Sequence, residues 1–75
     1  MNHKLKIKPE YMQNLLEGIK KAEIRYNDRD YQLGDTLEFW DVEHRFVWFE
    51  ITHIHSGLGL QDGYIVLSVK KVSKP

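Results

Sequence analysis

The sequence predicts an α+β fold: a small mixed, partly open β-barrel of about five strands with one N-terminal helix, in the order β-α-β-β-β-β. Three observations predict it. Most of the chain alternates apolar and polar residues at the period of a strand, and one early segment has helical spacing. The long segment from Phe46 to His55 changes parity after Ile51, which indicates a β-bulge of the kind that curves a strand into a barrel.

Length and composition limit the classes of protein to consider. The chain has 75 residues, so we expect a single domain over residues 1–75. It has no cysteine, which excludes disulfides, thiol nucleophiles and cysteine-ligated zinc or iron–sulfur clusters. Its apolar runs are short and its first residues lack the apolar stretch of a secretory signal. We therefore expect a cytoplasmic protein without a membrane partner.

The first strand and the helix are predicted from a change of period. Residues 3–8 alternate apolar and lysine side chains, as a half-buried strand does. Pro9 then favours the first turn of a helix, and Glu10 suits its positive end. Apolar residues recur at helical spacing through Ile19, and Gly18 marks the C-terminal end.

The second and third strands are separated by turn residues. From Ala22 to Tyr26 the period is two, so we expect Ala22 and Ile24 to face the core, while Glu23 and Arg25 project together from the other side. Turn-forming residues follow at 27–30 and 33–35, before a strand over 36–41.

The last two strands are the longest. A hairpin connection at 43–45 leads into the strand 46–55, with its bulge near Thr52 and His53. Residues 56–63 are predicted to form a loop because they are rich in glycine and polar residues. The final strand is expected over 64–72, almost wholly apolar through Leu67.

The zero net charge hides an uneven distribution. Residues 1–25 carry six Lys or Arg and three Glu, residues 26–62 carry two Arg and eight acids, and residues 63–75 carry three Lys and no acid. If the two terminal segments lie side by side, they form a positive face of the kind that binds polyanions. The alternative is that terminal lysines keep the sheet edges soluble.

The most charged segment is GIKKAEIRYNDRDYQLGD, with eight charged residues between positions 18 and 35. Glu23 and Arg25 share one side of a strand, and Lys20 can reach the same patch from the turn after the helix. Such a group can hold a flat polar ligand: Arg offers a fork for phosphate or a base edge, and Glu accepts from an exocyclic amine. The alternative is a surface ion pair that contributes about 0 to 1 kcal/mol.

A family resemblance supports the binding interpretation. Gly18, Lys20, Glu23 and Arg25 reproduce the GxKxxExR motif of the ASCH domains, a branch of the PUA-like superfamily of small barrels. With the extensions NDRDYxLGD and GYxVL, nearly the whole chain resembles a compact subfamily from bacteria and their phages whose members have no assigned function. The resemblance implies a cleft lined by the motif side chains that binds RNA or a nucleotide-like ligand.

Some ASCH proteins hydrolyse the acetyl amide of acetylated cytidine with a Lys, a Thr and a later Glu. Lys20 matches the first, but Glu23 stands at the Thr position, and no long segment between the last two strands could carry the later acid. We therefore expect an RNA- or nucleotide-binding module without a cofactor. The alternatives are an amide hydrolase on a modified nucleoside that uses Lys20, and a phage-related protein-interaction module that uses Trp40 and the acidic middle.

Other residues extend or compete with this site. Arg29 is the better binding candidate of its segment, since Asp28 and Asp30 suit tight turns, and Tyr31 lies where it could wall the cleft. The candidate binding residues are Lys20, Glu23, Arg25, Arg29 and Tyr31. His53 and His55 have the spacing of metal ligands but lack a convincing third ligand. Trp40 and Trp48 flank the hairpin and suit either base stacking or packing of the hairpin or core.

Overall fold

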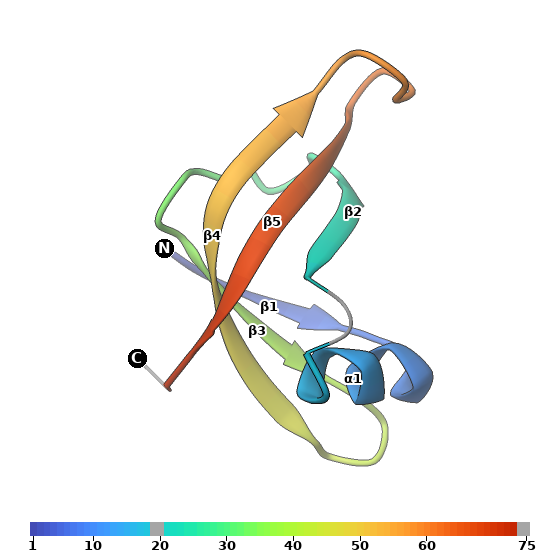
Figure 1. Ribbon diagram of the computed structural model, residues 1–75, viewed down its shortest axis with the longest axis vertical. Helices are drawn as coiled ribbons and strands as arrows, with labels where there is room; N and C mark the ends of the chain where they lie inside the picture. The colour runs from blue at the N-terminus through green and yellow to red at the C-terminus, as the bar shows by residue number, and fades with distance from the viewer. Residues whose placement is uncertain (19–20, 74–75) are drawn as a thin grey trace.

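The part of the chain that the structure describes contains five strands and one helix, in the predicted order (Figure 1). The computed structural model describes residues 1–18 and 21–73. The elements are β1 (Asn2–Lys6), α1 (Pro9–Leu16), β2 (Ala22–Tyr26), β3 (Thr36–Trp40), β4 (Phe46–Ser56) and β5 (Tyr64–Val72). The helix has eight residues, and no helix of the described part of the chain is long and apolar enough to cross a membrane.

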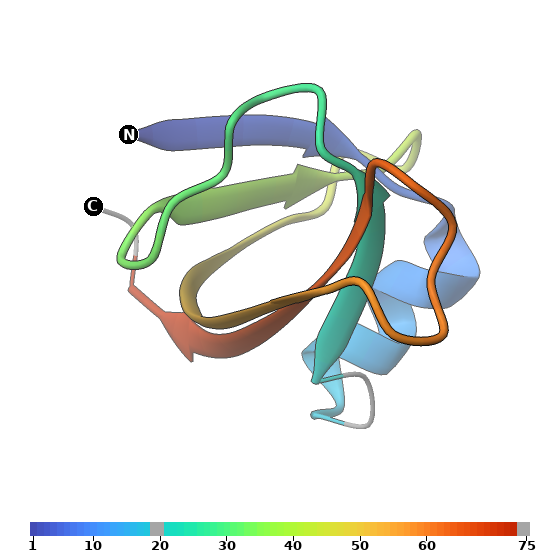
Figure 2. The same cartoon turned by 90° about the horizontal axis from the view of Figure 1, so that it is seen from above.

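The strands form one mixed sheet in the order β1-β3-β4-β5-β2. β1 runs parallel to β3, and the other neighbouring pairs are antiparallel. Seen from above, the sheet curls round until β2 approaches the end of β1 (Figure 2). The Arg25 guanidinium joins these two edge strands by donating from Nη2 to the Lys6 carbonyl at 3.3 Å. The sheet is thus a half-barrel, open along a seam between β1 and β2, as the prediction of a partly open barrel required.

The predicted bulge lies where the β4–β5 register shifts. Ile51 pairs with Val69, but His53, two residues on, already pairs with Ser68. One extra residue on β4 bends the strand and increases its twist. The bulge therefore accounts for the curvature that carries β5 and β2 round towards β1.

The core fills the concave side of the half-barrel. Leu37 and Phe39 from β3 are fully buried, and Phe39 meets Phe49 of β4 edge to face at 5.8 Å between ring centroids. α1 closes one end of this core with Met12 and Leu15. The helix ends as predicted, since Gly18 has the positive φ of 75° that commonly terminates helices. Ile19 lies outside the described residues.

The predicted orientation of β2 is wrong. Glu23 is only 8 % exposed, whereas Ile24 is 60 % exposed. The register with β5 is the cause: Glu23 lies opposite the buried Leu67, and residues directly opposite each other in a sheet share one face. β5 therefore turns the charged residues of β2 inwards. An inward-pointing charge on an edge strand also opposes pairing with another chain.

The two basic terminal strands do not lie side by side. Two strands, β3 and β4, separate β1 from β5 in the sheet. The two basic terminal segments, 1–25 and 63–75, do meet, but through β2, which pairs with β5, and not through β1. The cations that do gather near the binding candidates come from β1, the connection to α1, and β2.

Candidate functional site

An ion pair lies on β2 at the seam. The Arg25 guanidinium donates from Nη2 to Glu23 Oε2 at 3.2 Å, and the two side chains are 28 % and 11 % exposed. Glu23 and Arg25 therefore project together, as the sequence predicts, but from the concave side of the sheet. Lys20, the third member of the predicted cluster, lies outside the described residues.

Both side chains line a groove of about 410 Å³ that runs along the seam. We call it the seam groove. Its lining residues are Lys6, Ile7, Lys8, Tyr11, Glu23, Ile24, Arg25, Tyr26 and Tyr64. The groove is thus shared by β1, the start of α1, β2 and the first residue of β5.

Three tyrosines give the seam groove its aromatic surface. Tyr11, Tyr26 and Tyr64 are 44 %, 55 % and 38 % exposed. Tyr26 and Tyr64 are cross-strand partners whose rings meet edge to face at 5.4 Å. The Tyr26 ring lies directly on Gly63, where an added Cβ would come within 2.5 Å of its Cε1 atom. Glycine at this position therefore allows the ring to lie this close to the chain.

The charges in the seam groove favour an anion. Lys6 and Lys8 flank the connection from β1 to α1, and with Arg25 they place three cations against the Glu23 carboxylate among the lining residues. The predicted site residues include neither lysine, although the charge distribution places both in a possible positive face. Sequence reasoning missed Tyr11 because that residue fits the apolar face of the helix. Only the curl of the sheet brings them to β2.

Tyr31 does not wall the seam groove. Its side chain is 4 % exposed, and its ring packs against His3 at 4.7 Å between centroids. Burial raises the pKa of the Tyr31 phenol, while the nearby charges of Arg25 and Arg29 oppose the increase. Tyr31 therefore supports the loop between β2 and β3 from beneath, close to the cations of the site.

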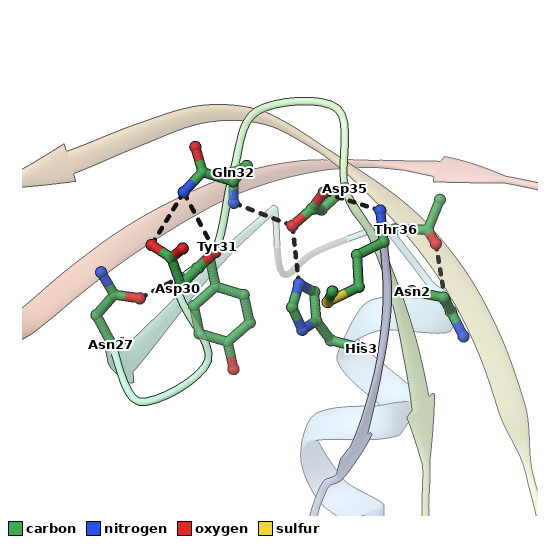
Figure 3. Close-up of polar contacts among 9 residues, drawn as sticks. Asn2, His3, Asn27, Asp30, Tyr31, Gln32, Asp35 and Thr36 are labelled. Carbon is green, nitrogen blue, oxygen red and sulfur yellow. Dashed lines mark hydrogen bonds and ion pairs between the residues drawn. The ribbon is translucent and has the colours of Figure 1, made fainter.

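Polar contacts, of which the one between His3 and Asp35 is buried, hold this loop in place (Figure 3). Asp35 accepts hydrogen bonds from the Gln32 amide at 3.0 Å and the Met1 amino group at 3.1 Å, and its Oδ2 lies 2.8 Å from His3 Nε2. The Asn27 side chain accepts from the Tyr31 amide at 3.2 Å. The His3–Asp35 contact could not be predicted, since the two residues are far apart in the chain and Asp35 fits a turn.

Asp35 should make the fold sensitive to acid. Burial alone would raise the pKa of its carboxyl group, but the contacts with His3, the Gln32 amide and the amino terminus outweigh this and lower the pKa from 3.8 to about 2. A lowered pKa means that Asp35 stabilises the fold above about pH 4 and that this stabilisation is lost as the pH falls through about 2.

We expect Asp35→Asn to lower the midpoint of thermal unfolding at neutral pH by roughly 5 °C or more, because bonds to a charged acceptor are lost. The variant should also lose less stability than the wild type between about pH 4 and pH 2. Thermal unfolding followed by circular dichroism measures both. The control Asp62→Asn, which changes an exposed acid, should behave as the wild type. If the unfolding midpoints of Asp35→Asn and the wild type fall in parallel between about pH 4 and pH 2, the ionised Asp35 carboxylate does not stabilise the fold.

The remaining candidates lie elsewhere. Arg29 is exposed and does not line the seam groove. Asp30 lies in the loop between β2 and β3 with a positive φ of 49°, a conformation that Asp tolerates better than most residues. His53 and His55 are exposed, and residues 1–18 and 21–73 contain no group of three side chains that could hold a metal ion. Trp40 and Trp48 do not face each other, since their cross-strand partners are Phe46 and Glu38.

Comparison with known proteins agrees with the predicted phage connection. The chain is 49 % identical over 35 residues to the "Uncharacterized 12.9 kDa protein in GpA 3'region" of Escherichia phage P2. That match covers 47 % of this chain and 32 % of the phage protein, so the chain spans about a third of that relative. A family described as "Domain of unknown function (DUF3850)" matches residues 2–69. Because this match extends over most of the sequence, the protein belongs to the DUF3850 family.

Proposed function

We propose that this chain is a binding module that holds a base and a phosphate of RNA, or a single nucleotide, in the seam groove. One observation carries the proposal: three exposed tyrosines and three cations converge with one carboxylate on a recess between the two edge strands. Aromatic faces stack bases, and cations bind phosphate. The seam groove offers both within one concavity.

The lining residues have distinct roles in this proposal. Tyr26 or Tyr64 stacks on the base, and Glu23 accepts a hydrogen bond from its exocyclic amine. Arg25 presents its guanidinium to the phosphate while Glu23 orients it. Lys6 and Lys8 add mobile positive charge on the opposite side of the seam.

We further propose that the half-barrel is of the ASCH type within the PUA-like superfamily. The motif residues Gly18, Glu23 and Arg25 support this, since the glycine ends the helix and the two charged residues line the seam groove. The curled mixed sheet with one early helix is also consistent with a small barrel of this class.

Salt dependence tests the role of the cations. Because three cations among the described residues line the seam groove, the logarithm of the affinity for single-stranded RNA should fall against the logarithm of salt concentration with a slope of roughly −2. Fluorescence anisotropy of a labelled RNA at several ionic strengths measures this slope. A parallel titration with a nucleoside monophosphate shows whether one nucleotide is enough. If the chain binds neither, or binds RNA with an affinity independent of salt, the proposal is wrong.

A further inference from the structure

A second aromatic surface lies on the side of the sheet that points away from the core. The strand registers place Lys4, Glu38 and Trp48 in one row across β1, β3 and β4, and Lys6, Trp40 and Phe46 in the next. Their neighbours along each strand, such as Leu5, Leu37 and Val47, are buried. We call the six residues of the two rows the outer face: Lys4, Lys6, Glu38, Trp40, Phe46 and Trp48.

The aromatic rings of the outer face are close together and partly open. Phe46 and Trp48 are stacked, with centroids 6.4 Å apart and planes at 18°, and Phe46 is 43 % exposed. Lys4 Nζ lies 5.9 Å from the centre of the Phe46 ring, and Lys6 Nζ lies 5.6 Å from that of Trp40. The two lysines thus lie side by side along the β1 edge of the outer face, and the three rings lie next to them on β3 and β4.

The acid of the outer face is already paired. Glu38 accepts a hydrogen bond from Trp48 Nε1 at 3.0 Å and lies 3.9 Å from Lys4 Nζ. Its charge is therefore balanced within the row, and Lys6 adds a positive charge at the edge of the sheet. Lys6 also lines the seam groove, so the outer face and the seam groove meet at this side chain.

We propose that the outer face binds the nucleotides next to the one held in the seam groove, so that the ligand is a single strand of nucleic acid rather than a mononucleotide. This inference rests on the proposed function of the seam groove. The partly open rings offer faces on which bases can stack, and the lysines along the neighbouring β1 edge offer positive charge to the phosphates between those bases. Lys6 belongs to both surfaces and marks the place where the bound strand passes from the seam groove to the outer face.

Tryptophan fluorescence separates the two surfaces. The chain has two tryptophans, and both lie on the outer face, whereas the aromatic residues of the seam groove are tyrosines. With excitation selective for tryptophan, a short oligoadenylate should quench the emission strongly, whereas adenosine monophosphate bound in the seam groove should change it only slightly, through Lys6 beside Trp40. The oligoadenylate should bind more tightly than the monophosphate.

Substitutions on the outer face should affect only the longer ligand. Phe46→Ala should weaken oligoadenylate binding roughly fivefold to a hundredfold, by the loss of one stacked base, and leave monophosphate binding unchanged. Lys4→Ala, at a side chain that is 62 % exposed, provides a second variant that should fold normally and also weaken only the oligoadenylate. Leu58→Ala removes a 93 % exposed apolar side chain elsewhere and should change neither affinity.

Two results would overturn the inference. Oligoadenylate binding that leaves tryptophan emission unchanged, or that is insensitive to both Phe46→Ala and Lys4→Ala, would show that the strand does not reach the outer face and would leave that face to a protein partner. The proposed function of the seam groove would survive either result. If neither ligand binds, both proposals fail together.

Discussion

Arg25→Ala should reduce the affinity for RNA or a nucleotide at least about tenfold, the largest loss expected from any single change in the seam groove. Two effects combine. The phosphate loses a charged donor, and bonds to charged groups are about twice as strong as neutral ones. Glu23, only 8 % exposed, also loses the cation at 3.2 Å and then repels the incoming phosphate.

Arg29→Ala is the matched control for this prediction. It removes the same charge four positions along the chain, from an exposed side chain that does not line the seam groove. Its effect on affinity should be small and should fade as salt is added. Equal losses in the two variants would mean that net charge, rather than the seam groove, determines binding.

Arg25→Lys separates charge from shape at the same position. Lysine keeps the positive charge but lacks the planar fork that can bind phosphate with two parallel hydrogen bonds. We expect an affinity between those of the wild type and Arg25→Ala. Thermal unfolding of each variant shows whether the lost bond from Arg25 to the Lys6 carbonyl has also opened the seam.

The strands and the bulge could be predicted because each depends on a local pattern. The parity of apolar residues in β4 changes within a few positions, and the register shift between Ile51 and His53 lies at that change. The helix could be predicted for the same reason, since Pro9 and Gly18 mark its ends within the sequence itself.

The orientation of β2 could not be predicted from its own residues. An apolar Ile24 between two charged side chains indicates the opposite burial, and the five-residue strand has no further alternation to correct the choice. The buried Ile65 and Leu67 of β5, some forty positions later, decide it through the register. Information of this kind lies in the pairing of strands rather than in either strand alone.

The candidate site also has a part that local sequence predicts and a part that depends on how the strands pair. The motif predicts that Glu23 and Arg25 act together, and the two side chains do form an ion pair that lines a groove. The other half of the seam groove comes from β1 and α1, which only the closure of the half-barrel brings close. Tyr31 was a candidate because it is near the motif in sequence, yet packing against His3 buries it.

Asp41 and Arg45 form a clamp that joins the β3–β4 hairpin to the start of α1. The fully buried Asp41 carboxylate accepts hydrogen bonds from the Glu43 and Arg45 amides, both at 3.0 Å, and from Arg45 Nε at 2.9 Å. The other guanidinium nitrogens donate to the Pro9 carbonyl at 3.0 Å and to Gln13 Oε1 at 2.9 Å. One arginine thus connects the hairpin to the helix that closes the core.

Arg45→Met should lower the midpoint of thermal unfolding at neutral pH by at least about 10 °C, because it leaves a buried carboxylate without its cation. Arg29→Met, the same substitution at an exposed turn, should change the midpoint little. Adding Asp41→Asn to Arg45→Met should restore part of the loss, since the double variant buries no unpaired charge.

The pH dependence of the Arg45→Met effect distinguishes loss of charge pairing from loss of packing. Burial would raise the pKa of the Asp41 carboxyl group, but the amide and guanidinium of Arg45 and the amide of Glu43 outweigh it and hold the pKa below its usual value. The clamp therefore stabilises the wild type above about pH 4, and this stabilisation is lost as the pH falls further. In Arg45→Met the carboxyl group can take up a proton and become neutral, so the difference in unfolding midpoint between variant and wild type should narrow in acid. If the difference in unfolding midpoint stays constant down to the lowest pH at which the wild type is folded, Arg45 acts through the packing of its aliphatic stem alone.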